Sequence, residues 1–175
     1  MKAKRIPLGD AMQGVLEAAK LLNAGKLVAF PTDTVYGLGA CVGIPEAVRA
    51  LYTAKGRPEN RPIPVLVASV EDVRKLAKAV PERAEKLFQA FFPGPLTVVL
   101  PAVEWIPPEI TAGTGSVGVR MPNSQAALEL IRLCGGALAV TSANLSGHTE
   151  ATTADEVLQQ IGDRIDAVLD GGKCP

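Results

Sequence analysis

Three polar clusters and one cationic loop carry the side chains of this sequence that could do chemistry. The polar clusters are PTDT at 31–34, Arg120 at the end of SVGVR, and SANLSG at 142–147. The loop KGRPENR, at 55–61, adds three cations among Gly and Pro residues. Hydroxyls, amides and cations are abundant here, and general bases are scarce. Such residues suit an anionic ligand whose reaction needs positioning and charge neutralisation, and nucleoside triphosphate chemistry fits that description.

The cations of the loop, Lys55, Arg57 and Arg61, allow two interpretations. They could converge on phosphate oxygens, with each Arg supplying a two-pronged donor. They could instead form a solvated charge run. Gly56 and Pro58 favour phosphate binding, because they fix a backbone that a merely solvated loop would not need to fix.

Arg120 and the SANLSG cluster each allow a binding interpretation and a structural one. Arg120 emerges from an apolar strand and is followed closely by a proline, so it could clamp a carboxylate or pair with an Asp or Glu at a sheet edge. Ser142, Asn144 and Ser146 could hold a ligand, or they could form a turn and helix-cap network.

The segment PTDTVYGLG, 31–39, is hard to explain as a simple connection between elements. Its hydrogen-bonding side chains precede glycines, and glycine lets a backbone approach a ligand closely. The residues concerned are Thr32, Asp33, Thr34, Tyr36, Gly37 and Gly39.

Several common mechanisms find no support in the sequence. His148 is its one histidine and no G-x-S-x-G occurs, so we do not expect a Ser-His-Asp hydrolase. Neither the G-x-x-x-x-G-K-[ST] phosphate loop nor a G-x-G-x-x-G after a strand is present. We expect no metal site built from protein ligands alone, because the clusters at the strand ends offer Asp33 as their only carboxylate.

Length and composition are typical of one cytoplasmic domain spanning 1–175. With 18 Lys and Arg against 18 Asp and Glu, no overall charge draws the chain to nucleic acid or to an anionic membrane. Its uncharged stretches are interrupted by Pro, Gly or polar residues, and no apolar signal-peptide core follows the basic N-terminus, so we expect neither a membrane span nor secretion. Cys41, Cys134 and Cys174 lack metal or redox spacing and are interpreted as buried thiols.

Apolar residues at helical spacing alternate with short β-branched runs, which predicts an α/β domain. Strands are predicted at 27–30, 64–68, 97–100, 116–120, 137–141 and 167–170. The first predicted helix runs from Asp10 to Gly25, and the second covers 45–55. A third begins at Ser69, a fourth ends at Pro93, and a fifth is capped by Asn123 or Ser124. The last begins at the capping box of Thr153 and Glu156. Ligands of open α/β sheets bind outside the carboxyl ends of the strands, and the three polar clusters fall at such ends.

Six motifs, taken in order, resemble those of one family, the YrdC-like threonylcarbamoyl-AMP synthases. They are PTDTVYGLG (31–39), KGRP (55–58), FFPGPLT (91–97), VGVRMP (117–122), TSANLSG (141–147) and LDGG (169–172). The resemblance implies a YrdC-like twisted mixed α/β sheet with flanking helices around a large concave cavity. It also implies a nucleotidyltransferase that makes threonylcarbamoyl-AMP and pyrophosphate from L-threonine, bicarbonate and ATP with Mg²⁺.

The same resemblance implies roles for individual residues. Around threonine it places Thr34, Arg120 and the backbone near Val140. Facing ATP it places a catalytic tetrad of Lys55, Arg57, Ser142 and Asn144, with Ser116 beside it. The cationic loop itself, rather than the resemblance, adds Arg61 to the residues expected to bind ATP. The chain departs from the family pattern at Arg61, where many relatives have Asn. We also expect it to lack the additional C-terminal domain of the longer relatives.

The resemblance further implies that the product passes to partner proteins that modify the adenosine beside the anticodon of tRNAs. Two other functions remain open. A carbamoyl-adenylating relative would use carbamoyl phosphate in place of threonine and bicarbonate. A non-catalytic module would bind double-stranded RNA or tRNA through phosphate contacts on a concave basic face.

Overall fold

One mixed sheet of eight strands organises the computed structural model, which describes residues 2–10 and 13–175. The strands are β1 (Lys4–Pro7), β2 (Val28–Pro31), β3 (Tyr36–Cys41), β4 (Val65–Val67), β5 (Val98–Pro101), β6 (Ser116–Arg120), β7 (Ala137–Ser142) and β8 (Ala167–Asp170). The helices are α1 (Gln13–Asn23), α2 (Pro45–Lys55), α3 (Val70–Leu76), α4 (Glu82–Phe91), α5 (Pro108–Thr111), α6 (Gln125–Leu133) and α7 (Ala154–Ile161). In space the strand order is β1-β8-β2-β3-β7-β4-β6-β5. The predicted α/β class is confirmed.

The helix signals of the sequence are largely confirmed. Helix α2 begins and ends where it was predicted, and Gly56 ends it in the left-handed conformation. The hydroxyls of Ser69, Ser124 and Thr153 accept backbone N–H groups at the starts of α3, α6 and α7, as N-caps do. Helix α1 ends at Asn23, and part of its predicted first turn, 11–12, lies outside the described residues.

All six predicted strands occur, but two further strands, β1 and β3, were missed. Strand β1 pairs with β8 at the edge of the sheet and is mostly exposed, so it lacks an apolar run. Strand β3 lies in the middle of the sheet, between β2 and β7. Its sequence, YGLGAC, looked like a binding loop because glycine normally weakens strands.

The glycines of β3 are explained by neighbouring side chains. A Cβ on Gly37 would lie 2.6 Å from Cγ1 of Val140, and one on Gly39 would lie 2.9 Å from Cε1 of Phe30. Both separations are too short for real carbon atoms. The absence of side chains at these positions therefore lets Phe30 and Val140 pack against the sheet.

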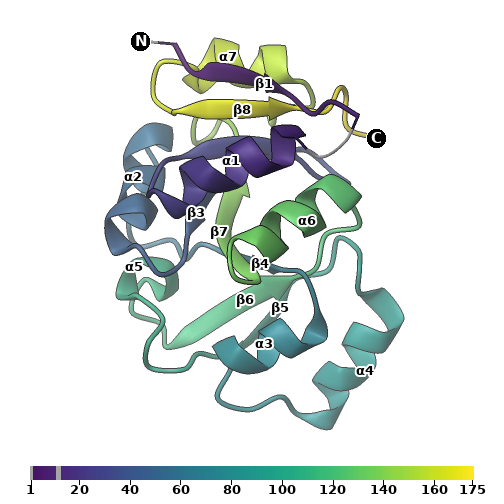
Figure 1. Cartoon of the computed structure of the whole chain (residues 1–175). Helices are drawn as coiled ribbons and strands as arrows, with labels where there is room; N and C mark the ends of the chain where they lie inside the picture. The colour runs from purple at the N-terminus through teal and green to yellow at the C-terminus, as the bar shows by residue number, and fades with distance from the viewer. Residues whose placement is uncertain (1, 11–12) are drawn as a thin grey trace.

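Two hydrophobic cores lie on opposite faces of the sheet, as the alternation along its strands requires. Val28 and Phe30 belong to the core beneath α1 and α6, whereas Ala29 belongs to the larger core that includes α2 and α7. Figure 1 shows α1 and α6 side by side in front of the sheet, with β1, β8 and α7 at one end and α3 and α4 at the other. None of the helices in the described ranges is long and apolar enough to cross a membrane.

The three cysteines form no disulfide within the described residues. All three are free thiols. Cys134 and Cys174 are buried, as predicted, and Cys41 is half-buried. Burial raises the pKa of Cys134 to about 12, so this thiol stays protonated near neutral pH.

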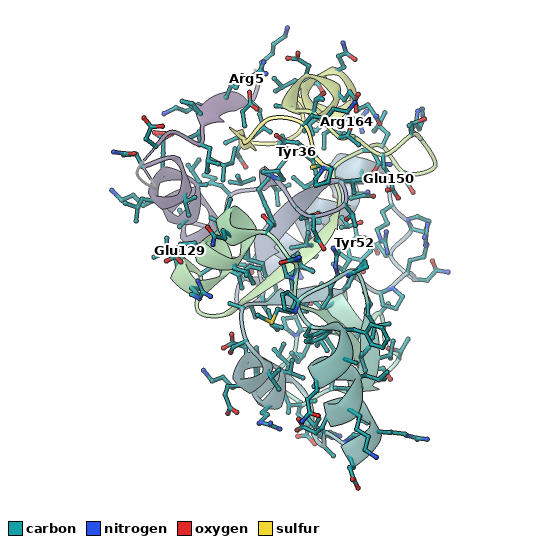
Figure 2. The ribbon with its side chains drawn as sticks, turned by 90° about the vertical axis from the view of Figure 1, so that its right-hand side faces the viewer. Arg5, Tyr36, Tyr52, Glu129, Glu150 and Arg164 are labelled. Carbon is teal, nitrogen blue, oxygen red and sulfur yellow. The ribbon has the colours of Figure 1, made fainter. Side chains whose placement is uncertain are left out.

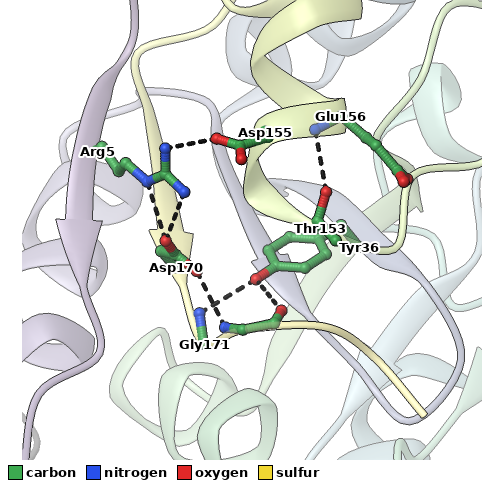
Figure 3. A network of polar contacts seen from close by, with 8 residues as sticks. Arg5, Tyr36, Thr153, Asp155, Glu156, Asp170 and Gly171 are labelled. Carbon is green, nitrogen blue, oxygen red and sulfur yellow. Dashed lines mark hydrogen bonds and ion pairs between the residues drawn. The ribbon is translucent and has the colours of Figure 1, made fainter.

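A polar network joins the LDGG motif to the start of β3 (Figure 3). The buried Tyr36 hydroxyl donates to the Gly172 carbonyl at 2.7 Å and accepts from the Gly171 N–H at 3.1 Å. At the exposed end of the network, Arg5 binds Asp155 at 2.7 Å and Asp170 at 2.8 Å. Burial raises the pKa of Tyr36 to about 12, so its hydroxyl remains a donor. The network holds 170–172 against the turn that precedes β3.

We expect Tyr36→Phe to lower the free energy of unfolding by about 1–3 kcal/mol, because it removes two hydrogen bonds of a buried hydroxyl, each worth about 0.5–1.5 kcal/mol. Asp155→Asn is the control, since Asp155 belongs to the same network but its side chain is 71% exposed. It should change stability by less than about 0.5 kcal/mol. Urea denaturation of the three proteins measures both effects, and equal stabilities for wild type and Tyr36→Phe would contradict the assigned role.

Candidate functional site

A pocket of about 310 Å³ opens where the polar clusters of the sequence meet, and we call it the central pocket. The residues that line it include Thr34, Arg57, Arg120, Val140, Ser142 and Glu150. They come from the turn between β2 and β3, the loop after α2, the end of β6, the end of β7 and the loop before α7. Five of these six were predicted as site residues, and segments far apart in the chain bring them together. The larger concave cavity implied by the resemblance stays a prediction.

Arg120 is fixed from several sides at the end of β6. Its Nη2 forms a part-buried ion pair with Asp33, and Nε donates to the Gly94 carbonyl at 3.0 Å. Nη1 lies 3.5 Å from the Thr34 hydroxyl. The ion-pair interpretation of Arg120 is thus confirmed, and the guanidinium also lines the central pocket. Asp33 and the Gly94 carbonyl of FFPGPLT therefore orient the guanidinium of Arg120, and its other N–H groups are left to bind a ligand in the pocket.

Lys55 is buried at the end of α2, with 3% of its surface exposed. Its ammonium donates to the carbonyl oxygen of Ser142 and lies 3.2 Å from the hydroxyl of the same residue. Burial, and then the positive charges of Arg57 and Arg61, lower the pKa of Lys55 to about 8, while Glu150 opposes this shift. The contact couples the cationic loop to the end of β7.

Arg57 crosses from the cationic loop to β7. Its Nη2 donates to the Pro62 carbonyl at 2.7 Å, and Nη1 donates to the Thr141 hydroxyl at 3.3 Å. Its Nε is buried and has no partner in the structure. Burial and the nearby Arg61 charge lower the pKa of Arg57, because both disfavour its charged form. A guanidinium held in this way, beside other cations and without a carboxylate partner, is suited to an anion.

Asn144 lies behind the pocket wall, with 4% of its surface exposed. Its Nδ2 donates to the carbonyls of Leu145 and His148, at 2.7 and 3.1 Å. This is the turn network that was one of the two interpretations of SANLSG. Its Oδ1 has no partner in the described part of the chain, so an acceptor remains for a ligand or water.

Of the six predicted ATP-binding residues, Arg57 and Ser142 line the central pocket, and Lys55 and Asn144 are buried outside its lining. The other two, Arg61 and Ser116, also lie away from the pocket wall. The side chain of Arg61 is exposed. Its backbone is held by α2, because the Tyr52 hydroxyl donates to the Arg61 carbonyl at 2.8 Å. Ser116 lines a neighbouring pocket of about 410 Å³. Pro64 and Thr97 line both pockets, so Ser116 is adjacent to the site rather than within its wall.

Sequence reasoning missed Glu150, Thr97 and Thr141, which also line the central pocket. Thr97 and Thr141 are the last and the first residues of two quoted motifs, so motif membership was the signal that could have found them. Glu150 follows SANLSG in a loop where nothing in the sequence pattern distinguishes it. Within residues 2–10 and 13–175, no group of three or more His, Cys, Asp or Glu side chains could hold a metal ion.

Comparison with known proteins places this geometry in a family context. The Sua5_yciO_yrdC family model, described as "Telomere recombination", matches residues 20–175. A Pyrococcus abyssi protein named threonylcarbamoyl-AMP synthase is 47% identical over 156 residues, which cover 89% of this chain and 46% of that protein. A Bacillus subtilis protein of the same name is 43% identical over 159 residues, 90% of this chain and 46% of that protein.

The structural comparison agrees with the sequence comparison. The crystal structure of P. abyssi Sua5 complexed with L-threonine matches with a TM-score of 0.93 at 42% identity, over 99% of this chain and 51% of that chain. The chain thus spans about half the length of these relatives.

Proposed function

The chain belongs to the Sua5_yciO_yrdC family, and on this premise we propose that it makes L-threonylcarbamoyl-AMP and pyrophosphate from L-threonine, bicarbonate and ATP. The observation that carries the proposal is the meeting of a carboxylate clamp and a cation cluster in one pocket. Arg120 and Thr34 form the clamp and line the pocket together with Arg57. Lys55, buried against Ser142 outside the pocket lining, forms the cation cluster with Arg57. The relatives named threonylcarbamoyl-AMP synthase support the activity, and the relative solved with L-threonine supports the substrate.

Threonine would enter at the Arg120 end of the central pocket. Its carboxylate would accept hydrogen bonds from the Arg120 guanidinium and the Thr34 hydroxyl, which lie 3.5 Å apart. The backbone at Val140 would form the wall beside the amino acid, because β7 crosses the pocket floor there. Two fixed donors at one end of the pocket would leave the amino group directed toward the cation cluster.

ATP would occupy the end of the pocket formed by the cationic loop and β7. Lys55 and Arg57 would neutralise phosphate charge, and Ser142 and Asn144 would supply a hydroxyl and the unpaired Oδ1. Arg61 and Ser116 flank this region, and we propose that they contact the nucleotide from outside the pocket wall. Mg²⁺ would enter as the ATP complex, with phosphate oxygens and water as most of its ligands.

The reaction forms two bonds in sequence. The threonine amine adds to bicarbonate-derived CO₂, losing a proton, to give a carbamate. A carbamate oxygen then attacks the α-phosphorus of ATP in line, a new P–O bond forms, and the bond to the leaving pyrophosphate breaks. Arg57 and Lys55 would stabilise the charge on the transferring and leaving phosphates, as fixed cations do in phosphoryl and nucleotidyl transfer.

The product is a mixed anhydride, so it must pass to an acceptor. We propose that partner proteins use it in the cytoplasm to modify tRNA adenosine, consistent with the names of the relatives.

Pyrophosphate release from ATP and Mg²⁺, with threonine and bicarbonate each added or withheld, tests the activity. Release that requires both is the expected result. Release with carbamoyl phosphate in their place would favour the carbamoyl-adenylating alternative. No release, together with salt-dependent binding of double-stranded RNA, would favour the binding module.

The lowered pKa of Lys55 predicts a pH dependence of ATP binding. Below about pH 8 the Lys55 ammonium is charged and attracts phosphate, and above that pH it loses its proton. We therefore expect ATP affinity to fall as the pH rises through the range above 8, because bound phosphate itself raises the pKa of the ammonium.

Calorimetric titration of ATP between pH 7 and pH 10 measures this dependence. Lys55→Met is the control, since it removes the titrating group while keeping an unbranched side chain. It should bind ATP more weakly at pH 7 and show no corresponding fall. A pH profile shared by both proteins would show that another group is responsible.

A further inference from the structure

Glu150 is an acidic side chain in the lining of a pocket whose other charged lining residues are both arginines. It lines the central pocket together with Arg57 and Arg120, and its side chain is exposed. No hydrogen bond or ion pair engages its carboxylate within the part of the chain that the structure describes. Asp33 is different, because it is only partly exposed and is paired with Arg120. Glu150 is therefore the carboxylate that an incoming ligand meets unneutralised.

The backbone on both sides of Glu150 is anchored. The carbonyl of Ala151 accepts the Tyr36 N–H at 2.8 Å, and the carbonyl of Thr149 accepts Nε2 of Gln160 at 2.7 Å. These contacts tie the residue to β3 on one side and to α7 on the other. In Figure 2, Glu150 lies above Tyr52, the residue whose hydroxyl holds the cationic loop. These contacts therefore fix the backbone that carries Glu150 beside the pocket.

The charge of Glu150 acts on the cation cluster. It favours the protonated form of Lys55, against burial and against the charges of Arg57 and Arg61. A carboxylate that attracts a cation at this site must also repel an anion bound there, because the two effects share one Coulomb interaction. The repulsion grows with each negative charge on the ligand. Mg²⁺ removes two of these charges when it binds to a nucleoside triphosphate.

We propose that Glu150 is a specificity-determining residue that makes the central pocket prefer the magnesium complex of a nucleoside triphosphate to the metal-free triphosphate. The inference rests on the proposed function, because it assumes that the cation cluster binds ATP. In this role Glu150 lowers affinity for the more highly charged ligand and leaves the magnesium complex less affected. Lys55 and Arg57 would supply the affinity for the triphosphate, and Glu150 would discriminate between its magnesium complex and its metal-free form.

Charge variants of the full chain test this inference. Calorimetry would measure the binding of ATP with EDTA, and of ATP with excess Mg²⁺, without threonine or bicarbonate. Glu150→Gln should bind metal-free ATP about 3- to 10-fold more tightly than wild type and gain less for the magnesium complex. Glu150→Lys should extend the same trend, and both gains should shrink at high salt. Glu104→Gln, an exposed carboxylate outside the central pocket wall, should leave both affinities unchanged.

The outcomes separate the inference from its premise. If wild type and variants bind both forms of ATP but Glu150→Gln gains nothing for the metal-free form, the discriminating role is wrong and nucleotide binding stands. If Glu150→Gln instead loses affinity for the magnesium complex alone, Glu150 is a metal ligand and the inference is overturned. If no protein binds ATP in either form, the proposed function fails and the inference fails with it.

Discussion

Arg57→Ala is expected to lower kcat/KM for pyrophosphate release by at least about 100-fold while the protein remains folded. Arg57 reaches from the cationic loop to Pro62 and Thr141 and lines the central pocket. Its guanidinium would meet the phosphates where charge develops, and fixed arginines in phosphoryl-transfer enzymes contribute about 10³–10⁵ to the rate. The fold should tolerate the change because the helix before this residue is already ended by Gly56.

Two further variants show whether charge or geometry is responsible. Arg57→Lys keeps a cation but loses the fork that contacts two oxygens at once, so it should retain only part of the activity. Arg61→Ala removes an exposed cation from the same loop and should cost much less, because screening by water weakens its interaction. Near-normal turnover by a well-folded Arg57→Ala protein would exclude the assigned role, and equal losses for Arg57 and Arg61 would point to the net charge of the loop.

Arg120→Lys is expected to raise the KM for threonine about 100-fold with little change in ATP affinity. A lysine can keep the charge beside Asp33, but it cannot also bind the Gly94 carbonyl and present a donor next to Thr34. The threonine carboxylate would therefore lose its oriented, charge-assisted hydrogen bonds, each worth about 1.5–3 kcal/mol. Initial rates at varied threonine, and ATP titration by calorimetry, separate the two effects.

Lysine is the informative replacement here because truncation would disturb the fold. Arg120→Ala would leave the part-buried carboxylate of Asp33 without its partner, which would lower stability as well as threonine binding. Arg74→Lys is a matched control, since Arg74 is a surface arginine that pairs with Glu71 and Glu85. It should leave both KM values unchanged. Parallel losses of threonine and ATP binding in Arg120→Lys would mean that Arg120 supports the whole pocket rather than one substrate.

The motifs that offer no chemistry of their own hold the pocket in place. FFPGPLT supplies the Gly94 carbonyl that orients Arg120, and its last residue, Thr97, lines the pocket. In LDGG, the Gly171 N–H donates to the Tyr36 hydroxyl, and the Gly172 carbonyl accepts from it. Tyr36 directly follows the turn that carries Thr34. The side chains of these two motifs did not indicate a function, and the contacts give both motifs a structural role beside the pocket.

The sequence by itself determined the elements whose formation is local. Helix α2 begins at Pro45 and ends before Gly56 because proline and glycine act on their own backbone, and serine or threonine caps mark other helix starts for the same reason. The six apolar strands were likewise readable from short runs of residues. Local signals failed at β3, where Gly37 and Gly39 are required by the side chains of Val140 and Phe30 from neighbouring strands.

The sequence also identified most of the polar residues of the site, because their types and positions at strand ends limit the chemistry available. Only the tertiary structure decided how they are used. It buried Lys55 and thereby lowered its pKa, paired Arg120 with Asp33 across 86 intervening residues, and placed Glu150 at the pocket edge. Burial and charge pairing depend on distances between segments remote in the chain, and no local pattern records those distances.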